Sequence, residues 1–160
     1  MTRIGITGHS NLSVDSVTLV RKALEKALAP YAGESLVGVS CLARGADQLF
    51  AEAVIEAGGE VEVVLPSADY REAKVKPGDL DRFDDLLVRS SLVRYMPHRR
   101  ADRAAYEDAN EAVLDGVDLL FAVWDGQPSG GRGGTGDAVE AARERGLPVE
   151  VIWPEGARRD

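Results

Sequence analysis

The stretch LVGVSCLARGADQLFAEAVIEA, residues 36–57, decides the fold class of this chain. Its first part, Leu36–Cys41, is a short apolar run typical of a buried strand, and residues 45–57 show the apolar spacing of a helix. Small residues connect the two parts. A strand followed at once by a helix is the repeating unit of parallel α/β proteins, so this stretch predicts a βα unit.

The same alternation continues on both sides of that stretch. Residues 67–79 are expected to form a loop, and Ser13 is expected to cap the first helix. The expected strands cover residues 3–7, 36–41, 60–65, 92–96, 117–124 and 149–153, and the expected helices cover residues 14–31, 45–57, 80–90, 102–114 and 135–145. A length of 160 residues suits one domain. We therefore expect residues 1–160 to form a single Rossmann-like domain, a three-layer α/β/α sandwich around a mainly parallel sheet of five to six strands.

Composition narrows the class of protein further. Apolar residues make up 44% and charged residues 29% of the chain, as in an average soluble globular protein. The formal net charge of −8 argues against polynucleotide binding, which normally needs a basic face, but it leaves room for a small phosphorylated ligand. Cys41 is the only cysteine, so no intrachain disulfide is expected, and neither a signal peptide nor a membrane-spanning run is seen. These features predict a cytoplasmic protein without a membrane partner.

The carboxyl ends of parallel strands are where α/β domains bind ligands, and the first two expected strands end in unusual turns. In the turn at residues 7–10, Gly8 allows close approach of the backbone to a ligand and His9 offers a side-chain donor. An ordinary βα turn is the alternative reading of this segment. The second turn, residues 40–47, supplies further candidate ligand contacts in Ser40, Arg44 and Gly45.

Asp47, at the end of that second turn, has two predicted roles. It either caps the helix, or it orients Arg44 and a ribose hydroxyl.

A third turn is the strongest candidate for ligand binding, because GGRGGTGD at residues 130–137 leads directly into the last helix. Glycine loses much conformational freedom on folding, so this loop is best explained by backbone amides that surround an anion at a helix N-terminus. A flexible surface linker is the alternative. The candidate phosphate contacts are Gly130, Gly131, Gly133, Gly134 and Thr135. The loop lacks the lysine of a Walker A motif and no G-x-G-x-x-G follows the first strand, so neither ATP hydrolysis nor hydride transfer is supported.

Carboxylates supply the remaining candidates. Asp125 follows an apolar strand and is placed to bind ribose or water at the sheet edge. Glu107 shares a helix with Tyr106 and Asn110, and it becomes a candidate acid or base if that face borders the cleft; a solvated helix face is the alternative. Asp137 is the other candidate catalytic carboxylate. Two histidines and one cysteine without metal-ligand spacing predict no metal site.

The turn at residues 40–47, followed by Gly58-Gly59 and the stretch Val63–Pro66, resembles the core of DprA/Smf proteins. The segment Gly130–Thr135 resembles the phosphate loop of Lonely Guy (LOG) phosphoribohydrolases. Together they resemble the SLOG superfamily of Rossmann-like nucleotide-binding domains. In LOG enzymes a proline precedes the two glycines and a catalytic glutamate follows three residues after the threonine, whereas this chain has Ser129 and Ala138 there. The departure weakens the implied hydrolase activity.

The resulting functional hypothesis is a module, such as a sensor, that binds a nucleotide or nucleotide-derived ligand, AMP-like or ADP-ribose-like. The alternatives are an N-glycosidic hydrolase of nucleoside monophosphates, with Glu107 or Asp137 as acid or base, and a structural or protein-interaction domain. No cofactor is assigned beyond such a nucleotide. The resemblance implies a homo-oligomer. Because this chain is acidic, the DNA-processing role of DprA is not expected of it.

Overall fold

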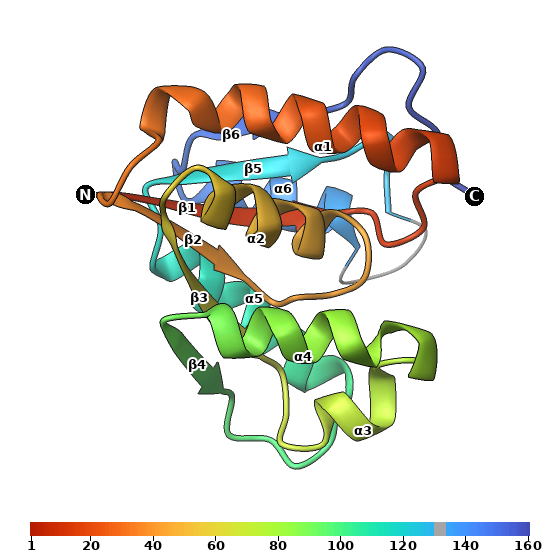
Figure 1. Ribbon diagram of the computed structural model, residues 1–160. Helices are drawn as coiled ribbons and strands as arrows, with labels where there is room; N and C mark the ends of the chain where they lie inside the picture. Colours follow the sequence, from red (N-terminus) through yellow and green to blue (C-terminus); the bar gives the residue numbers. More distant parts are fainter. Residues whose placement is uncertain (130–133) are drawn as a thin grey trace.

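A twisted parallel sheet forms the centre of the structure, a computed structural model that describes residues 1–129 and 134–160 (Figure 1). Within those residues every pairing between neighbouring strands is parallel. The strands are β1 (Thr2–Gly8), β2 (Leu36–Ser40), β3 (Glu60–Leu65), β4 (Leu92–Tyr95), β5 (Leu119–Val123) and β6 (Val149–Val151). The six strands and their parallel pairing confirm the Rossmann-like fold class expected from the sequence.

The strand order β4-β3-β2-β1-β5-β6 fixes where a ligand site belongs. From β1 in the middle of the sheet, the chain builds outward to β4 and then returns to place β5 on the other side of β1. Strand order therefore reverses between β1 and β5, whose last pair in register is Gly8 with Val123. In open α/β sheets, the crevice beyond the carboxyl ends of the strands at such a reversal is the usual ligand site.

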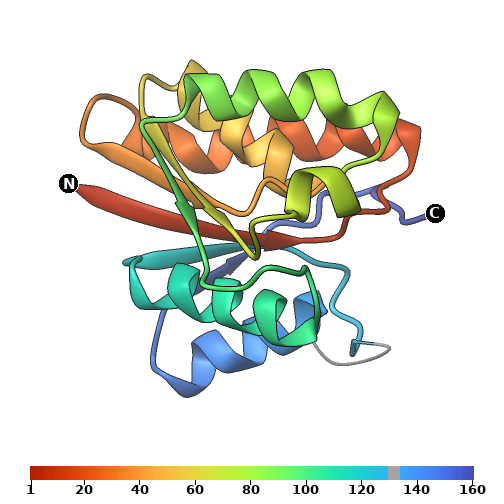
Figure 2. The ribbon, with the colours of Figure 1, turned by 90° about the horizontal axis from the view of Figure 1, so that it is seen from below.

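Helices cover both faces of the sheet (Figure 2). The helices are α1 (Val14–Leu28), α2 (Ala46–Glu56), α3 (Tyr70–Lys74), α4 (Leu80–Arg89), α5 (Arg103–Asp115) and α6 (Thr135–Glu144), with short 3₁₀ turns at Ala29–Tyr31 and Pro77–Asp79. Helices α1, α2 and α4 lie on one face, and α5 and α6 lie on the other (Figures 1 and 2). The Ser13 side chain caps α1 by accepting a hydrogen bond from the amide of Ser16 at 3.3 Å.

Each face of the sheet has its own apolar core. Under α1, α2 and α4, the rings of Phe50 and Phe121 meet edge to face with centroids 6.0 Å apart. Gly38 makes room for Phe50, because a Cβ at this position would lie 2.9 Å from the phenyl ring. On the opposite face, Val39 and Val113 belong to the apolar cluster beneath α5. Burial on both faces explains why the strands are continuous apolar runs.

Residues 67–79 differ from the loop expected from the sequence. They contain the short helix α3 and the 3₁₀ turn Pro77–Asp79. A helix of five residues is too short to show a helical repeat, so periodicity alone could not identify it. It forms because Tyr70 is buried against Phe83 of α4, with ring centroids 6.0 Å apart.

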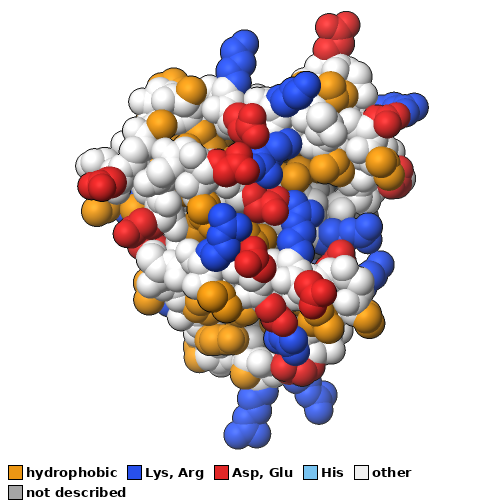
Figure 3. All heavy atoms as spheres, viewed as in Figure 1, with side chains coloured by type: hydrophobic (Ala, Val, Ile, Leu, Met, Phe, Trp, Pro, Cys, Tyr) orange, Lys and Arg blue, Asp and Glu red, His pale blue; other side chains and the backbone are white. Residues whose placement is uncertain are grey.

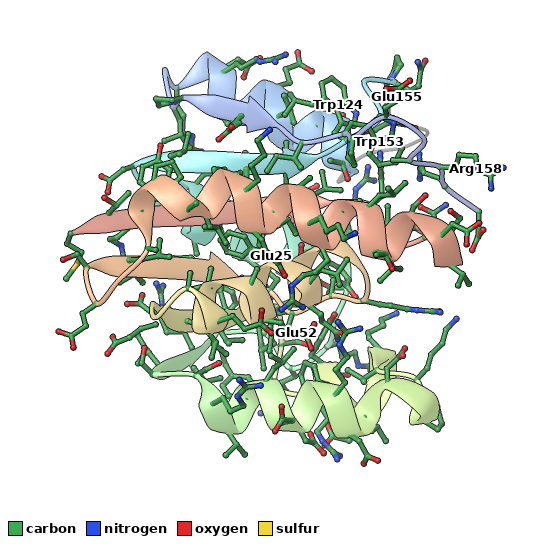
Figure 4. All side chains as sticks on the ribbon, turned by 45° about the horizontal axis from the view of Figure 1, so that its top comes forward. Glu25, Glu52, Trp124, Trp153, Glu155 and Arg158 are labelled. Atoms are coloured by element: carbon green, nitrogen blue, oxygen red, sulfur yellow. The ribbon has the colours of Figure 1, made fainter. Side chains whose placement is uncertain are left out.

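The outer face of α1, α2 and α4 carries interleaved acidic and basic side chains (Figure 3). Arg21 of α1 approaches Glu52 at 3.3 Å and Glu56 at 2.7 Å, and Arg82 of α4 also pairs with Glu52. Glu25 and Glu52 can be located on this face in Figure 4. Opposite charges are therefore paired across neighbouring helices on this face.

Candidate functional site

A cleft of about 500 Å³ opens at the carboxyl ends of β1, β2 and β3, beside the reversal of strand order. Its lining comes from the turns after β1 and β2, from α3 and α5, and from the segment that precedes α6. The lining includes Thr7, Gly8, His9, Ser10, Cys41, Ala43, Arg44, Asp47, Tyr70, Lys74, Tyr106, Asn110, Gln127, Ser129, Gly134, Thr135, Gly136 and Arg159. Three separate sequence turns therefore meet in one cavity.

The turns after β1 and β2 interlock, and two glycines make this possible. A Cβ on Gly8 would lie 2.4 Å from the Cβ of Ala46, far inside a normal contact. Gly45 has φ of +86°, and a Cβ there would lie 2.7 Å from the carbonyl oxygen of His9. The amide of Ala46 donates to that same oxygen at 3.2 Å. Gly8 also lines the cleft, whereas Gly45 is not among its lining residues and supports the site by packing.

The turn between β2 and α2 is held by buried polar side chains. Ser40 Oγ accepts from the amide of Leu42 at 3.0 Å and donates to the carbonyl of Asp47 at 3.1 Å. Leu42 has φ of +54°, a strained value for a residue with a side chain, and Gln48 Nε2 donates to its carbonyl at 3.1 Å. Ser40 therefore lies beneath the cleft, where it stabilises the turn.

His9 connects the first turn to both sides of the final loop. Its Nε2 accepts a hydrogen bond from the amide of Asp125 at 3.1 Å, which leaves the ring proton on Nδ1. Nδ1 lies 3.4 Å from Oγ1 of Thr135, and the ring meets Trp153 edge to face with centroids 5.6 Å apart. Burial, with a smaller effect of the Arg159 charge, lowers the pKa of His9. The imidazole is therefore neutral at neutral pH.

Asp47 is a buried carboxyl group on the wall of the cleft. Burial raises its pKa to about 7, against the opposing effect of a hydrogen bond from the amide of Ala43, 3.4 Å from Oδ2. Among the residues that the structure describes, Oδ1 has no hydrogen-bond donor. The residue at the N-cap position of α2 is Gly45, so Asp47 acts neither as the helix cap nor as a partner of Arg44. Arg44 is instead exposed and lies 3.9 Å from Asp79.

The predicted phosphate loop is described only at its end. Gly130, Gly131 and Gly133 lie outside the described residues. Gly134 is the N-cap of α6 and Thr135 its first residue, and both line the cleft. Ser129 Oγ accepts a hydrogen bond from the amide of Asp137 at 3.1 Å, so one amide of the first turn of α6 is already used.

The other three predicted carboxylates lie beside the cleft rather than on its lining. Asp125 approaches His9 Nε2 at 3.3 Å and Arg159 at 3.5 Å. Glu107 is exposed and lies 3.4 Å from Arg103 on the same helix. Asp137 lines a neighbouring hollow together with Trp124, which is labelled in Figure 4.

Further residues line the cleft besides the contacts predicted from the sequence. Tyr106 and Asn110, one helical turn apart, turn the same face of α5 to the cleft, whereas Glu107 lies beside that face. Lys74 comes from α3, and Arg159 comes from the segment after β6. The spacing of Tyr106 and Asn110 was visible in the sequence, but no local signal linked Lys74 or Arg159 to this site.

Residues 1–129 and 134–160 contain neither a metal-ligand cluster nor a membrane-spanning helix. No cluster of three or more histidine, cysteine, aspartate or glutamate side chains in these ranges has the arrangement needed for a metal ion. None of the helices described there combines the length and the apolar character needed to span a membrane.

This chain is similar to known proteins in its structure. No family model and no curated protein sequence matches the chain. The fold is similar to DNA processing protein A (DprA) from Streptococcus pneumoniae (TM-score 0.69, 18% identity) and from Helicobacter pylori (TM-score 0.66, 16% identity). These matches cover 94% of this chain but only 50% and 64% of the two DprA chains. A molybdenum cofactor binding protein from Rippkaea orientalis is also similar (TM-score 0.60, 15% identity; 94% of this chain and 75% of that chain).

These similarities confirm the Rossmann-like fold that was expected from the sequence, and the chain shares this fold with DprA and with the molybdenum cofactor binding protein. They also correct one expectation. The expectation that an acidic net charge excludes polynucleotide binding is wrong as an argument, because the Helicobacter pylori DprA, which has the same fold, binds single-stranded DNA. Net charge sums the whole surface, whereas binding depends on the local field at one site, so the charge of the chain is no ground for that exclusion.

Proposed function

We propose that this protein binds a nucleotide or nucleotide-derived phosphorylated ligand in the cleft, with its phosphate near the start of α6. The observation that carries the proposal is the charge of the cleft. Arg44, Lys74 and Arg159 line it, and Asp47 is the one acidic side chain among the described lining residues. A chain with a net charge of −8 thus presents three cations at the usual ligand position of its fold.

The start of α6 supports the placement of the phosphate. Thr135 and Gly136 line the cleft, and within the described part of the chain their amides have no acceptor. Unpaired amides and the positive end of a helix dipole favour an anion at this position. The Thr135 hydroxyl, 3.4 Å from His9 Nδ1, is a further donor for a phosphate oxygen.

The opposite wall suits the uncharged part of a nucleotide. Tyr70 and Tyr106 approach each other edge to face with ring centroids 6.3 Å apart, and both line the cleft with Asp47. Asp47 Oδ1 is available to a ribose hydroxyl or an amino group of a base. A volume of about 500 Å³ falls within the usual range of small-molecule sites, roughly 300–1,000 Å³.

Thermal denaturation across a ligand panel tests this proposal. AMP, CMP and ADP-ribose are compared with adenosine and inorganic phosphate. At 100 times its dissociation constant a ligand stabilises the folded state by about 2.7 kcal/mol, which corresponds to a rise in Tm of roughly 5–10 °C for a chain of this size. We expect at least one phosphorylated ligand to produce such a rise and adenosine to produce less. If no nucleotide at millimolar concentration changes Tm, the proposal is wrong.

The position of Asp47 favours a second candidate function, hydrolysis of the N-glycosidic bond of a nucleoside monophosphate. A cleft carboxyl with a pKa of about 7 is suited to proton transfer at neutral pH. In this reaction water attacks C1′, the bond from C1′ to the base nitrogen breaks, and the protonated carboxyl delivers its proton to the departing base. The carboxylate then receives a proton from the attacking water, and the products are the free base and ribose 5-phosphate. Asp47 replaces Glu107 and Asp137 in this role, because it is the acid on the cleft wall.

Chromatography of AMP and CMP after incubation with the protein tests this second candidate. Hydrolysis predicts equal amounts of free base and ribose 5-phosphate, and their loss in Asp47→Asn. Binding of the same nucleotide without release of base would leave the first proposal and remove the second.

A further inference from the structure

Residues 157–160 return to the turn after β1 and are fixed there by backbone hydrogen bonds. The amide of Asp160 donates to the carbonyl of Asn11 at 2.7 Å, and an antiparallel bridge pairs Leu12 with Arg159. The amide of Ser13 donates to the carbonyl of Arg158 at 3.0 Å. Arg159 is thereby placed on the lining of the cleft.

The guanidinium of Arg159 is restrained on two sides. Its Nε donates to Oδ1 of Asn11 at 2.9 Å, and its Nη1 lies 3.5 Å from Oδ2 of Asp125. The Asn11 side chain is itself fixed, because its Nδ2 donates to the carbonyl of Asp160 at 2.8 Å. Within the described residues, Nη2 of Arg159 has no acceptor. One donor nitrogen of a restrained cation is thus left for another molecule.

The same contacts place this cation near the start of α6. Asp125 contacts Arg159 on one side and His9 Nε2, at 3.3 Å, on the other. The His9 ring then reaches Thr135 through Nδ1. Arg159 and Thr135 are therefore joined by two intervening side chains on one side of the cleft.

We propose that Arg159 is a ligand-binding residue whose guanidinium donates to the phosphate of the ligand, with Asn11 and Asp125 holding it in position beforehand. This inference rests on the function proposed above. An arginine suits the role because its guanidinium keeps Nη2 as a donor while Nε and Nη1 are held by Asn11 and Asp125, and its charge strengthens the hydrogen bond to a phosphate oxygen. Restraint before binding reduces the entropy that is lost when the side chain is ordered on the ligand.

Arg158 is a matched control for this inference. It neighbours Arg159, carries the same charge, and extends away from the body of the protein in Figure 4. Its side chain is 72% exposed, its Nη2 lies 4.0 Å from Oδ2 of Asp15, and it is not part of the cleft lining. Replacing either arginine with glutamine changes the net charge equally, so only position distinguishes the two variants.

Isothermal titration of AMP, ADP-ribose, inorganic pyrophosphate and adenosine into the wild type, Arg159→Gln, Arg159→Lys and Arg158→Gln tests the inference. For the phosphorylated probes we expect Arg159→Gln to raise Kd about ten- to hundred-fold, as for the loss of a charge-assisted hydrogen bond. Arg159→Lys keeps the charge but not the fork and should raise Kd less. Arg158→Gln should stay within about twofold of the wild type, and the affinity for adenosine should not depend on Arg159.

The possible outcomes separate this inference from the proposed function. Equal binding of AMP to the wild type, Arg159→Gln and Arg159→Lys overturns the role of Arg159 and leaves the proposed function. An equal loss of AMP and adenosine affinity in both Arg159 variants also overturns it, since that pattern indicates a structural role. If the wild type binds none of the phosphorylated probes, both proposals are wrong.

Discussion

Nδ1 of His9 lies 3.4 Å from Oγ1 of Thr135, and this contact joins the turn after the first strand to the start of the last helix. The other ring nitrogen accepts a hydrogen bond from the amide of Asp125, so one neutral imidazole contacts both ends of the connection between β5 and α6. The arrangement makes His9 a structural part of the cleft as well as a lining residue.

His9→Ala should therefore destabilise the protein. The change leaves the amide of Asp125 without its acceptor and removes the ring that packs on Trp153, so we expect a loss of about 1–3 kcal/mol in the free energy of unfolding. Urea denaturation measures this loss. The only other histidine, His98, pairs with Asp108 at 2.5 Å near the surface, and His98→Ala should cost less than about 1 kcal/mol. Equal losses in the two variants would contradict the role assigned to His9.

Gly8→Ala should destabilise the fold through overpacking. The new methyl group would lie 2.4 Å from the Cβ of Ala46, and neither backbone can shift without disturbing the interlocked turns. A loss of about 1–3 kcal/mol is expected in urea denaturation. Gly78→Ala is the control, because a Cβ at Gly78 has no neighbour within 4 Å, and it should change stability by less than about 0.5 kcal/mol. Unchanged stability of Gly8→Ala would show that the two turns are not tightly packed.

Gly134→Val should impair ligand binding more than folding. Its Cβ would lie 2.6 Å from Oγ of Ser129, the atom that accepts from the Asp137 amide, so the substitution displaces the start of α6 beside the cleft. We expect the Kd for the best nucleotide to rise more than about tenfold, while Tm falls by only a few degrees. Gly78→Val controls for the added side chain. A nucleotide affinity equal to that of the wild type would exclude the start of α6 from the site.

Asp47→Asn should change the dependence of stability on pH. Burial raises the pKa of Asp47 from 3.8 to about 7, so the folded state holds a proton that the unfolded state releases between these two values. Protonated Asp47 therefore contributes to the stability of the wild type at low pH. This contribution, at most about 4 kcal/mol, is lost as pH rises from about 4 to 7. Asn carries no charge, so Tm of Asp47→Asn minus Tm of the wild type should increase over this window and level off above pH 7.

Tm measured from pH 4 to pH 8.5 tests this expectation. Asp81 is exposed, so the difference in Tm between Asp81→Asn and the wild type should change much less over the same pH range. A constant difference between Asp47→Asn and the wild type would mean that Asp47 is ionised throughout.

The sequence predicted the fold because its signals are local. Apolar runs such as Leu36–Cys41, each followed by an amphipathic segment, indicate parallel βα units regardless of how the units pack. Parallel strands bring their carboxyl ends to one edge of the sheet, so the sequence alone predicts that the turns at Gly8 and Arg44 lie at the same edge. Helix α3 was not predicted, because its formation depends on the burial of Tyr70 against Phe83.

The sequence alone thus determined a parallel α/β sheet and the edge at which its polar turns gather, since both follow from residue periodicity and chain direction. Only the tertiary structure decided which side chains reach the cleft. Tyr106 lines the cleft, whereas Glu107 on the same helix does not. Arg159 lines the cleft because it contacts Asn11 and Asp125, which are distant from it in the chain. Such placements depend on packing between separate segments, and no local pattern of residues encodes them.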